Sequence, residues 1–244
     1  MPLGPRLMAE CPIDDHARQW LEENLERLRS VLGPGILQNR PIVLPTDAFF
    51  PFAYDGSDGA VARVFRTVCR LMDVNPDRLK VFVNDDKQEF WPVDEDGNPI
   101  PLEPGGEFEI GPDGPSVSIA RSELHDASLV VATFAHEIAH FRLFEAKADK
   151  GDAVDRELFT DLAAVHLGFG VFIANDPRVW LAHADVWPGT DVLMPRYLSA
   201  EMTTYALAMT ARRQNDQRPP WLRYLDQDAV ANAKANLRYL SLGP

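Results

Sequence analysis

The sequence predicts an α+β fold in which several helices pack with a small mixed sheet. Apolar residues recur at helical spacing in six stretches, and two short stretches between them have the composition or the alternation of strands. The chain has 244 residues, of which 45% are hydrophobic, and this is enough for one good-sized core. We therefore expect a single domain over residues 1–244, with an N-terminal α/β part (1–104) and a second part (105–244) that ends in helices.

The first half of the chain contains residues that typically begin or end helices. Aspartate and serine favour helix N-caps, and Gly33-Pro34-Gly35 ends the first helix. The elements predicted here are a helix from Asp14 or Asp15 to about Leu32, a short strand near 42–44 in an otherwise irregular stretch, a helix of about Gly59–Met72 opened by Ser57 or Asp58, and a strand over Leu79–Asn84.

A region rich in glycine, proline and acidic residues follows, from Asp85 to Gly114. It predicts a loop or a weak hairpin and carries no catalytic signal of its own. Residues 116–120 then alternate polar and apolar side chains, which predicts a half-buried strand.

The next predicted helix, from about Asp126 to Phe144, is apolar nearly all round and is therefore expected to be buried. It carries His136-Glu137-Ile138-Ala139-His140, an HExxH motif. Side chains four residues apart share one helix face, so both imidazoles can reach one ion at about 2.0–2.1 Å. Glu137 lies beside the pair, where it can take a proton from water at the metal. Buried histidines without a partner are costly, and a metal removes that cost.

A short polar connection predicts that a second, antiparallel helix follows and runs to about Ala174. On it, Glu157 comes level with His140, and Asp161 comes level with His136. We expect Glu157 to be the third ligand and Asp161 to be the acceptor that holds the His136 ring. Small residues on the same stripe, Ala164 and Gly168, would let the two helices approach closely. The rival third ligands lie in or beside the connection: Glu145, Asp149, Asp152 and Asp155.

With these residues in view, the chain resembles the gluzincins, the thermolysin-like metallopeptidases with HExxH followed by ExxxD. The resemblance spans about residues 116–174 and implies a zincin-like fold, with zinc held by His136, His140 and Glu157. It also implies that Glu137 is the general base and that Asp161 orients a histidine. It implies that the strand at 116–120 is the sheet edge lining the cleft, where an extended peptide could add as a further strand. Arg142 departs from the family, which usually has an apolar residue there.

More loosely, residues 44–57, 160–175 and 197–208 look like a group of bacterial HExxH proteins of the peptidase type. In the last third, Ser199 is expected to cap a helix to about Arg213, and Asp228 a final helix to about Leu240. A donor that stabilises an oxyanion should come from this region. We prefer Tyr197, just before a helix start; Tyr205, His166 and His183 are the alternatives.

The net charge and the cysteine content limit the binding partners and the cellular location that we expect. The net charge of −13 makes nucleic acid and anionic membranes poor partners, and no apolar run approaches the length of a membrane span. Two distant cysteines, Cys11 and Cys69, do not form a disulfide framework, so a cytoplasmic location is the default. The oligomeric state is not indicated by the sequence.

The predicted function is a zinc metallopeptidase that acts on a peptide or protein substrate. Two alternatives remain open. One is a non-catalytic protein in which zinc closes the hairpin, with His166 or Asp161 as fourth ligand. The other is an intracellular regulator whose zincin-like domain recognises or cleaves one protein partner. Manganese or cobalt would also suit these ligands.

Overall fold

The computed structural model describes residues 11–38, 40–85, 105–148, 151, 153–176 and 198–242. Within them the protein is a mixture of helices and one three-stranded mixed sheet, so the predicted α+β class is confirmed. The chain divides into two compact units, Phe50–Phe141 and Met1–Phe49 with Arg142–Pro244. The expectation of one domain with parts 1–104 and 105–244 stays a prediction.

The sheet belongs to the unit Phe50–Phe141 and has the order β1-β3-β2. Strand β1 (Lys80–Asn84) runs parallel to β3 (Gly114–Ala120), and β2 (Gly106–Gly111) runs antiparallel to it. The expectation that residues 116–120 form a sheet edge is therefore wrong, because β3 is the central strand. The reason is β2, which arises from the acidic, glycine-rich region and pairs with β3 through a tight turn at Gly114 (φ 103°).

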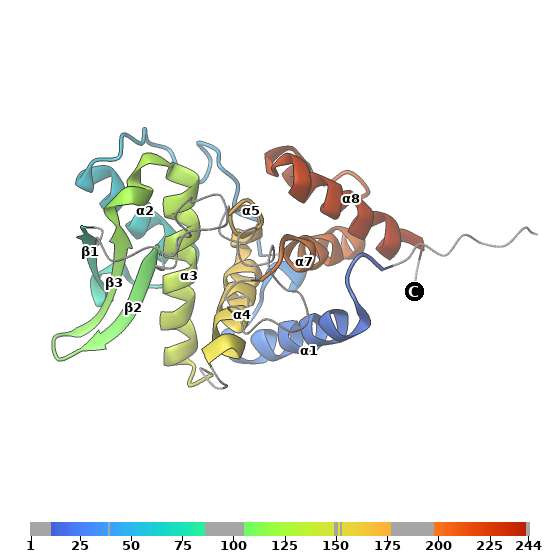
Figure 1. The fold of residues 1–244 in the computed structure, drawn as a ribbon, viewed down its shortest axis with the longest axis horizontal. Helices are drawn as coiled ribbons and strands as arrows, with labels where there is room; N and C mark the ends of the chain where they lie inside the picture. Colours follow the sequence, from blue (N-terminus) through green and yellow to red (C-terminus); the bar gives the residue numbers. More distant parts are fainter. Residues whose placement is uncertain are drawn as a thin grey trace, which may run out of the picture. The chain divides into compact units, whose positions relative to one another are not determined.

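Two helices pack in the same unit. Ser57 caps α2 (Asp58–Leu71), since its side chain accepts a hydrogen bond from the Ala60 N–H at 3.2 Å. The helix α3 (Ala127–Glu145) is buried nearly all round, as its apolar composition predicts. The rings of Phe65 on α2 and Phe134 on α3 meet edge to face at 5.3 Å. Figure 1 shows α3 alongside the sheet.

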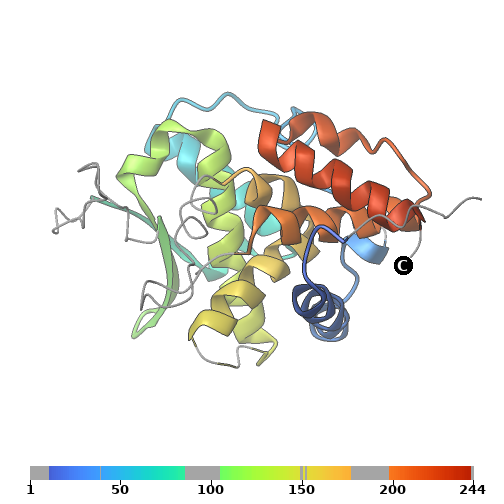
Figure 2. The ribbon, with the colours of Figure 1, turned by 45° about the vertical axis from the view of Figure 1, so that its right-hand side comes forward.

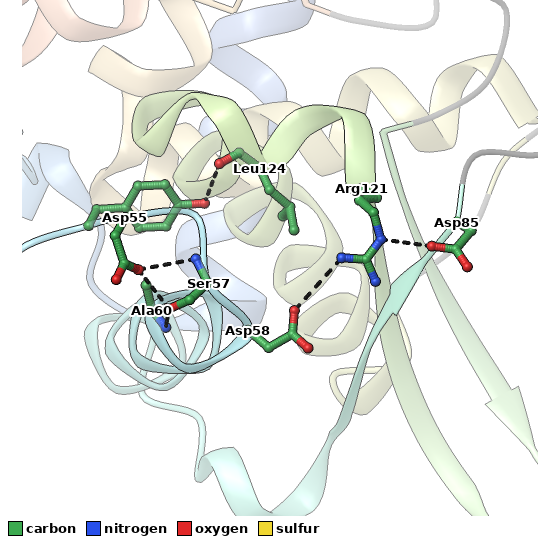
Figure 3. Close-up of polar contacts among 8 residues, drawn as sticks. Asp55, Ser57, Asp58, Ala60, Asp85, Arg121 and Leu124 are labelled. Carbon is green, nitrogen blue, oxygen red and sulfur yellow. Dashed lines mark hydrogen bonds and ion pairs between the residues drawn. The ribbon is translucent and has the colours of Figure 1, made fainter.

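Arg121 connects the segment before α3 to two other elements (Figure 3). It lies in η3 (Arg121–His125), and its Nε is 2.7 Å from the Asp85 carboxylate, while a terminal nitrogen is 3.9 Å from that of Asp58. The Tyr54 hydroxyl donates to the Leu124 carbonyl at 2.9 Å in the same region. Exposed ion pairs contribute only about 0–1 kcal/mol each, so these two add little to the stability of the fold.

The other unit is helical. It contains α1 (Asp15–Leu32), η1 (Ile36–Gln38), α4 (Ala153–Ala164), η4 (Val165–Phe169), α5 (Gly170–Ala174), α7 (Ala200–Arg213), η5 (Pro220–Tyr224) and α8 (Gln227–Leu242). Asp14 and Ser199 cap α1 and α7 as predicted. The last helix begins at Gln227, so Asp228 lies in its first turn and is not its cap. Figures 1 and 2 both show α7 and α8 side by side.

The predicted helix up to Ala174 is present but kinked at Gly168, whose φ of 108° is left-handed. The Gly168 carbonyl accepts the Val43 N–H at 2.8 Å, and a Cβ at this position would lie 2.6 Å from the Pro41 carbonyl oxygen. Gly168 therefore makes room for residues 41–43, which are irregular. This contact differs from the helix-to-helix approach that the sequence suggested for it.

One segment, Asp155–Ala174, has the length and hydropathy of a membrane span, with a mean hydropathy of 1.5 in its most apolar window. Within the structure, 89% of that window is buried. A core helix of a soluble protein meets the same criterion, so this segment alone is weak evidence for a membrane. The predicted absence of a membrane partner and the cytoplasmic location stay predictions.

Candidate metal centre

His136 and His140 lie one turn apart on α3, and their Nε2 atoms face each other at 3.1 Å. Two ligands of a tetrahedral zinc at about 2.0–2.1 Å are separated by about 3.3 Å, so the observed spacing fits a shared ion. The His136 side chain is 7% exposed, and His140 is partly buried. The arrangement follows from the i, i+4 spacing on a regular helix.

Glu157, on α4, completes the group. The ligand atoms of His136, His140 and Glu157 all lie within 4.8 Å of one another. Among the residues that the structure describes, no other histidine, cysteine, aspartate or glutamate forms such a group with them. Two nitrogens and one carboxylate oxygen are a donor set that suits zinc and other divalent transition metals.

Glu137 is only 5% exposed, and a glycine makes room for its side chain. A Cβ added at Gly106, at the start of β2, would come 3.0 Å from Glu137 Cγ and 2.6 Å from Thr133 Cγ2. Thr133 is held in turn, because its hydroxyl donates to the buried Glu123 carboxylate at 2.6 Å. The start of β2 thus packs closely against the turn of α3 that carries the glutamate.

Phe108 on β2 lies next to the histidine pair. Its ring is nearly parallel to that of His140, with an interplanar angle of 7° and a centroid separation of 6.4 Å, and it meets Phe141 edge to face. In the described part of the chain, no strand pairs with the other edge of β2. The strand nearest to the histidines therefore has a side on which a further strand could pair.

Asp161 is 2% exposed, and its Oδ2 accepts the backbone N–H of Leu198 at 2.7 Å. This bond connects α4 to the residues just before α7. A carboxylate can accept several hydrogen bonds, so the bond leaves capacity for a further donor. The expected bond from the His136 ring to Asp161 stays a prediction.

The structure describes two of the four candidates for oxyanion stabilisation. Tyr197 and His183 lie outside the described residues. The Tyr205 hydroxyl is buried and donates to the Glu22 carboxylate at 3.0 Å, and burial raises the pKa of Tyr205. His166 is 1% exposed, its Nε2 lies 3.0 Å from the Gly33 carbonyl oxygen, and burial lowers its pKa. Tyr205 and His166 thus have buried structural contacts.

Sequence reasoning did not single out Gly106, Phe108, Thr133 or Glu123. The alternation in residues 106–111, where Glu107 and Glu109 flank Phe108, was the available signal for β2. The other contacts depend on tertiary packing, which no local pattern encodes.

Comparison of the chain with models of known protein families, with curated proteins and with solved structures finds no significant match. The residues of the site are therefore the basis for assigning a function.

Proposed function

We propose that this chain is a zinc-dependent metallopeptidase with a gluzincin-like site, in which His136, His140 and Glu157 hold the ion. The observation that supports the proposal best is the convergence of these three side chains, with all ligand atoms within 4.8 Å. When bound, zinc supplies Lewis acidity toward a carbonyl group and lowers the pKa of water. Three protein ligands are also the usual number in catalytic zinc sites, in contrast to the four of structural ones.

In this proposal Glu137 is the general base. Its carboxylate takes a proton from the attacking water as the carbon–oxygen bond forms, and passes it to the amine as the carbon–nitrogen bond breaks. The close approach of Gly106 to Glu137 Cγ limits the positions that its side chain can take. Asp161 is proposed to hold the His136 ring, and Tyr197 to donate to the developing oxyanion.

The substrate is proposed to be an extended peptide that pairs with the edge of β2 on which no described strand lies. Backbone hydrogen bonds would then hold it in register, and the side chains facing α3 would meet Phe108. This assigns to β2 the role that the sequence suggested for residues 116–120. It follows from the strand order, in which β3 is enclosed by β1 and β2.

Metal binding is tested first, because it has a readout that does not depend on activity. The purified chain should contain, or take up after chelation and dialysis, one zinc per chain, measured by elemental analysis and calorimetric titration. Glu157→Gln should weaken zinc binding by about 10- to 100-fold, since it replaces a charged ligand. Glu145→Gln, which changes a rival acid at the end of α3, is the matched control and should bind as the parent chain does.

Hydrolysis is then measured with a mixture of peptides, in the zinc-loaded and the chelated protein. Cleavage that requires zinc supports the peptidase. Stoichiometric zinc without cleavage of any peptide would instead favour the non-catalytic or partner-specific alternatives. Absence of stoichiometric metal, both as purified and on titration, would overturn the proposal.

A further inference from the structure

A groove of about 1010 Å³ lies in the helical unit, between the end of α7, η5 and the second half of α8. Its floor is apolar and buried: Ala208, Ala211 and Leu240 are 0%, 1% and 5% exposed. Leu237 lines its wall and is half-buried, and Leu242 is 42% exposed. The groove is therefore a concave apolar surface that is open to solvent.

Five cationic side chains line this groove: Arg212, Arg218, Arg223, Lys234 and Arg238. The one acid in its lining, Asp216, accepts a hydrogen bond from the backbone N–H of Arg218 at 2.9 Å. Arg223 contacts the neighbouring Tyr224, through a hydrogen bond and over the ring. In the part of the chain that the structure describes, none of the five forms an ion pair. On a chain with a net charge of −13, this is a local reversal of charge.

Only some of these five cations lie where a positive charge stabilises the end of a helix. Arg212 lies in the last turn of α7, where a positive charge favours the helix dipole. Lys234 lies in the middle of α8, and Arg218 and Arg223 lie outside both helices, in or before η5. At those positions no helix end is stabilised. Unpaired cations on two sides of an apolar floor instead match the chemistry of a ligand that is both apolar and anionic.

We infer that this groove binds an acidic amphipathic helix of a partner protein. In this mode of recognition, an apolar helix face lies in a groove while its polar flanks pair with the rim. The volume of about 1010 Å³ is at the upper end of small-molecule sites, about 300–1,000 Å³, which favours a segment of chain over a small ligand. A nucleic-acid duplex or an anionic bilayer presents a broad negative surface, which the rest of this acidic protein repels.

The binding test uses a defined probe. A fluorescein-labelled, amidated peptide of about 14 residues, with leucines on one helix face and glutamates elsewhere, is titrated with the full chain and followed by anisotropy. The expected result is saturable binding in the micromolar range, weakened at least about tenfold between about 0.05 and 0.5 M salt. The same peptide with lysine in place of glutamate should not bind.

Variants locate the site. The double variant Arg212→Glu with Arg238→Glu should weaken binding by at least about tenfold, because it places two carboxylates beside the glutamates of the peptide. Arg70→Glu is the matched control, since Arg70 is also an exposed cation in the last turn of a helix, on α2. It should change the dissociation constant by less than about twofold. Leu242→Ser tests the apolar contribution at an exposed position and should weaken binding several-fold.

The inference is overturned if the acidic peptide does not bind, if the lysine peptide binds equally well, or if the double variant binds like the control. It is also overturned if dodecanoate or phosphatidylserine vesicles bind in an Arg212- and Arg238-dependent manner while the peptide does not. None of the three proposed metal ligands lines the groove, so the chelated chain should bind the peptide with the same dissociation constant as the zinc-loaded chain.

Discussion

Gly106 on β2 lies against the side chain of Glu137 on α3, so closely that a single added methyl group would come 3.0 Å from Glu137 Cγ. In the proposed peptidase this contact limits the positions that the base can take. Gly106→Ala should therefore lower zinc-dependent hydrolysis by about 10- to 100-fold while zinc remains bound. Gly111→Ala is the control on the same strand, because the nearest atom to its Cβ is at 3.9 Å. Equal activity of both variants would show that the contact does not position Glu137.

Replacement of Glu137 itself separates metal binding from chemistry. Glu137→Gln keeps the size of the side chain but removes the basic carboxylate. We expect one zinc per chain by elemental analysis and a rate of hydrolysis lower by about 10²- to 10⁴-fold. Undiminished hydrolysis by the zinc-loaded variant would contradict the general-base role.

Gly35 is predicted to be essential for the packing of His166. A Cβ at Gly35 would lie 2.1–2.5 Å from three atoms of that imidazole ring, which is buried and cannot move aside freely. Gly35→Ala should lower the free energy of unfolding in urea by about 1–3 kcal/mol or more. Gly59→Ala is the control, since the nearest atoms to its Cβ are at 3.9 Å and alanine suits the helix α2. A Gly35→Ala variant as stable as the control would be evidence against this packing.

His166 is expected to make stability depend on pH. Burial lowers its pKa below the ordinary value of 6.5, so the folded state resists protonation that the unfolded state accepts. The contribution to stability is thus present above about pH 6.5 and is lost as the pH falls, by up to about 1.4 kcal/mol per pH unit. In urea unfolding between about pH 7 and 5, His166→Gln should show a shallower slope than the parent chain. His16→Gln, at an exposed position of α1, is the control, and an equal change in both variants would contradict the role of burial.

The Cys69 thiol is predicted to be unreactive in the folded protein. It is fully buried on α2, and burial raises its pKa to about 12. Because the thiolate is the reactive form, iodoacetamide at about pH 8 should label the partly exposed Cys11 and reach Cys69 only in denaturant. Peptide mapping by mass spectrometry distinguishes the two sites. Rapid labelling of Cys69 in the native chain would show that α2 opens readily.

Most helices were predictable because their patterns are local. The helix starts were indicated by the capping residues Asp14, Ser57 and Ser199. The apolar composition around the HExxH motif indicated that α3 is buried. The convergence of His136, His140 and Glu157 was also expected. The i, i+4 spacing and the short connection place these residues at the same level along the axes of two antiparallel helices. These features depend on residues close together in the sequence.

The strand order was not predictable in the same way. The alternation of β3 predicted a half-buried strand, and Val117 and Ile119 are indeed buried while the residues between them are not. Its place at the sheet edge was only what the resemblance implied. Alternation reports which face of a strand is covered, and it does not report how many neighbours the strand has. The sequence predicts only a loop or weak hairpin where β2 lies, because Gly106 and Gly111 flank a strand of only six residues that includes two glutamates.

The bond from Val43 to Gly168 joins two sequence segments that are separated by the whole of the unit Phe50–Phe141. The apolar face of α1, with Leu21, Leu25 and Leu28, packs against α4 and α7, which leave the ribosome much later. At about 5–20 residues per second, that delay is on the order of ten seconds. During synthesis α1 is therefore without the helices that later cover it. The nascent chain then exposes a hydrophobic helix face that a chaperone can recognise.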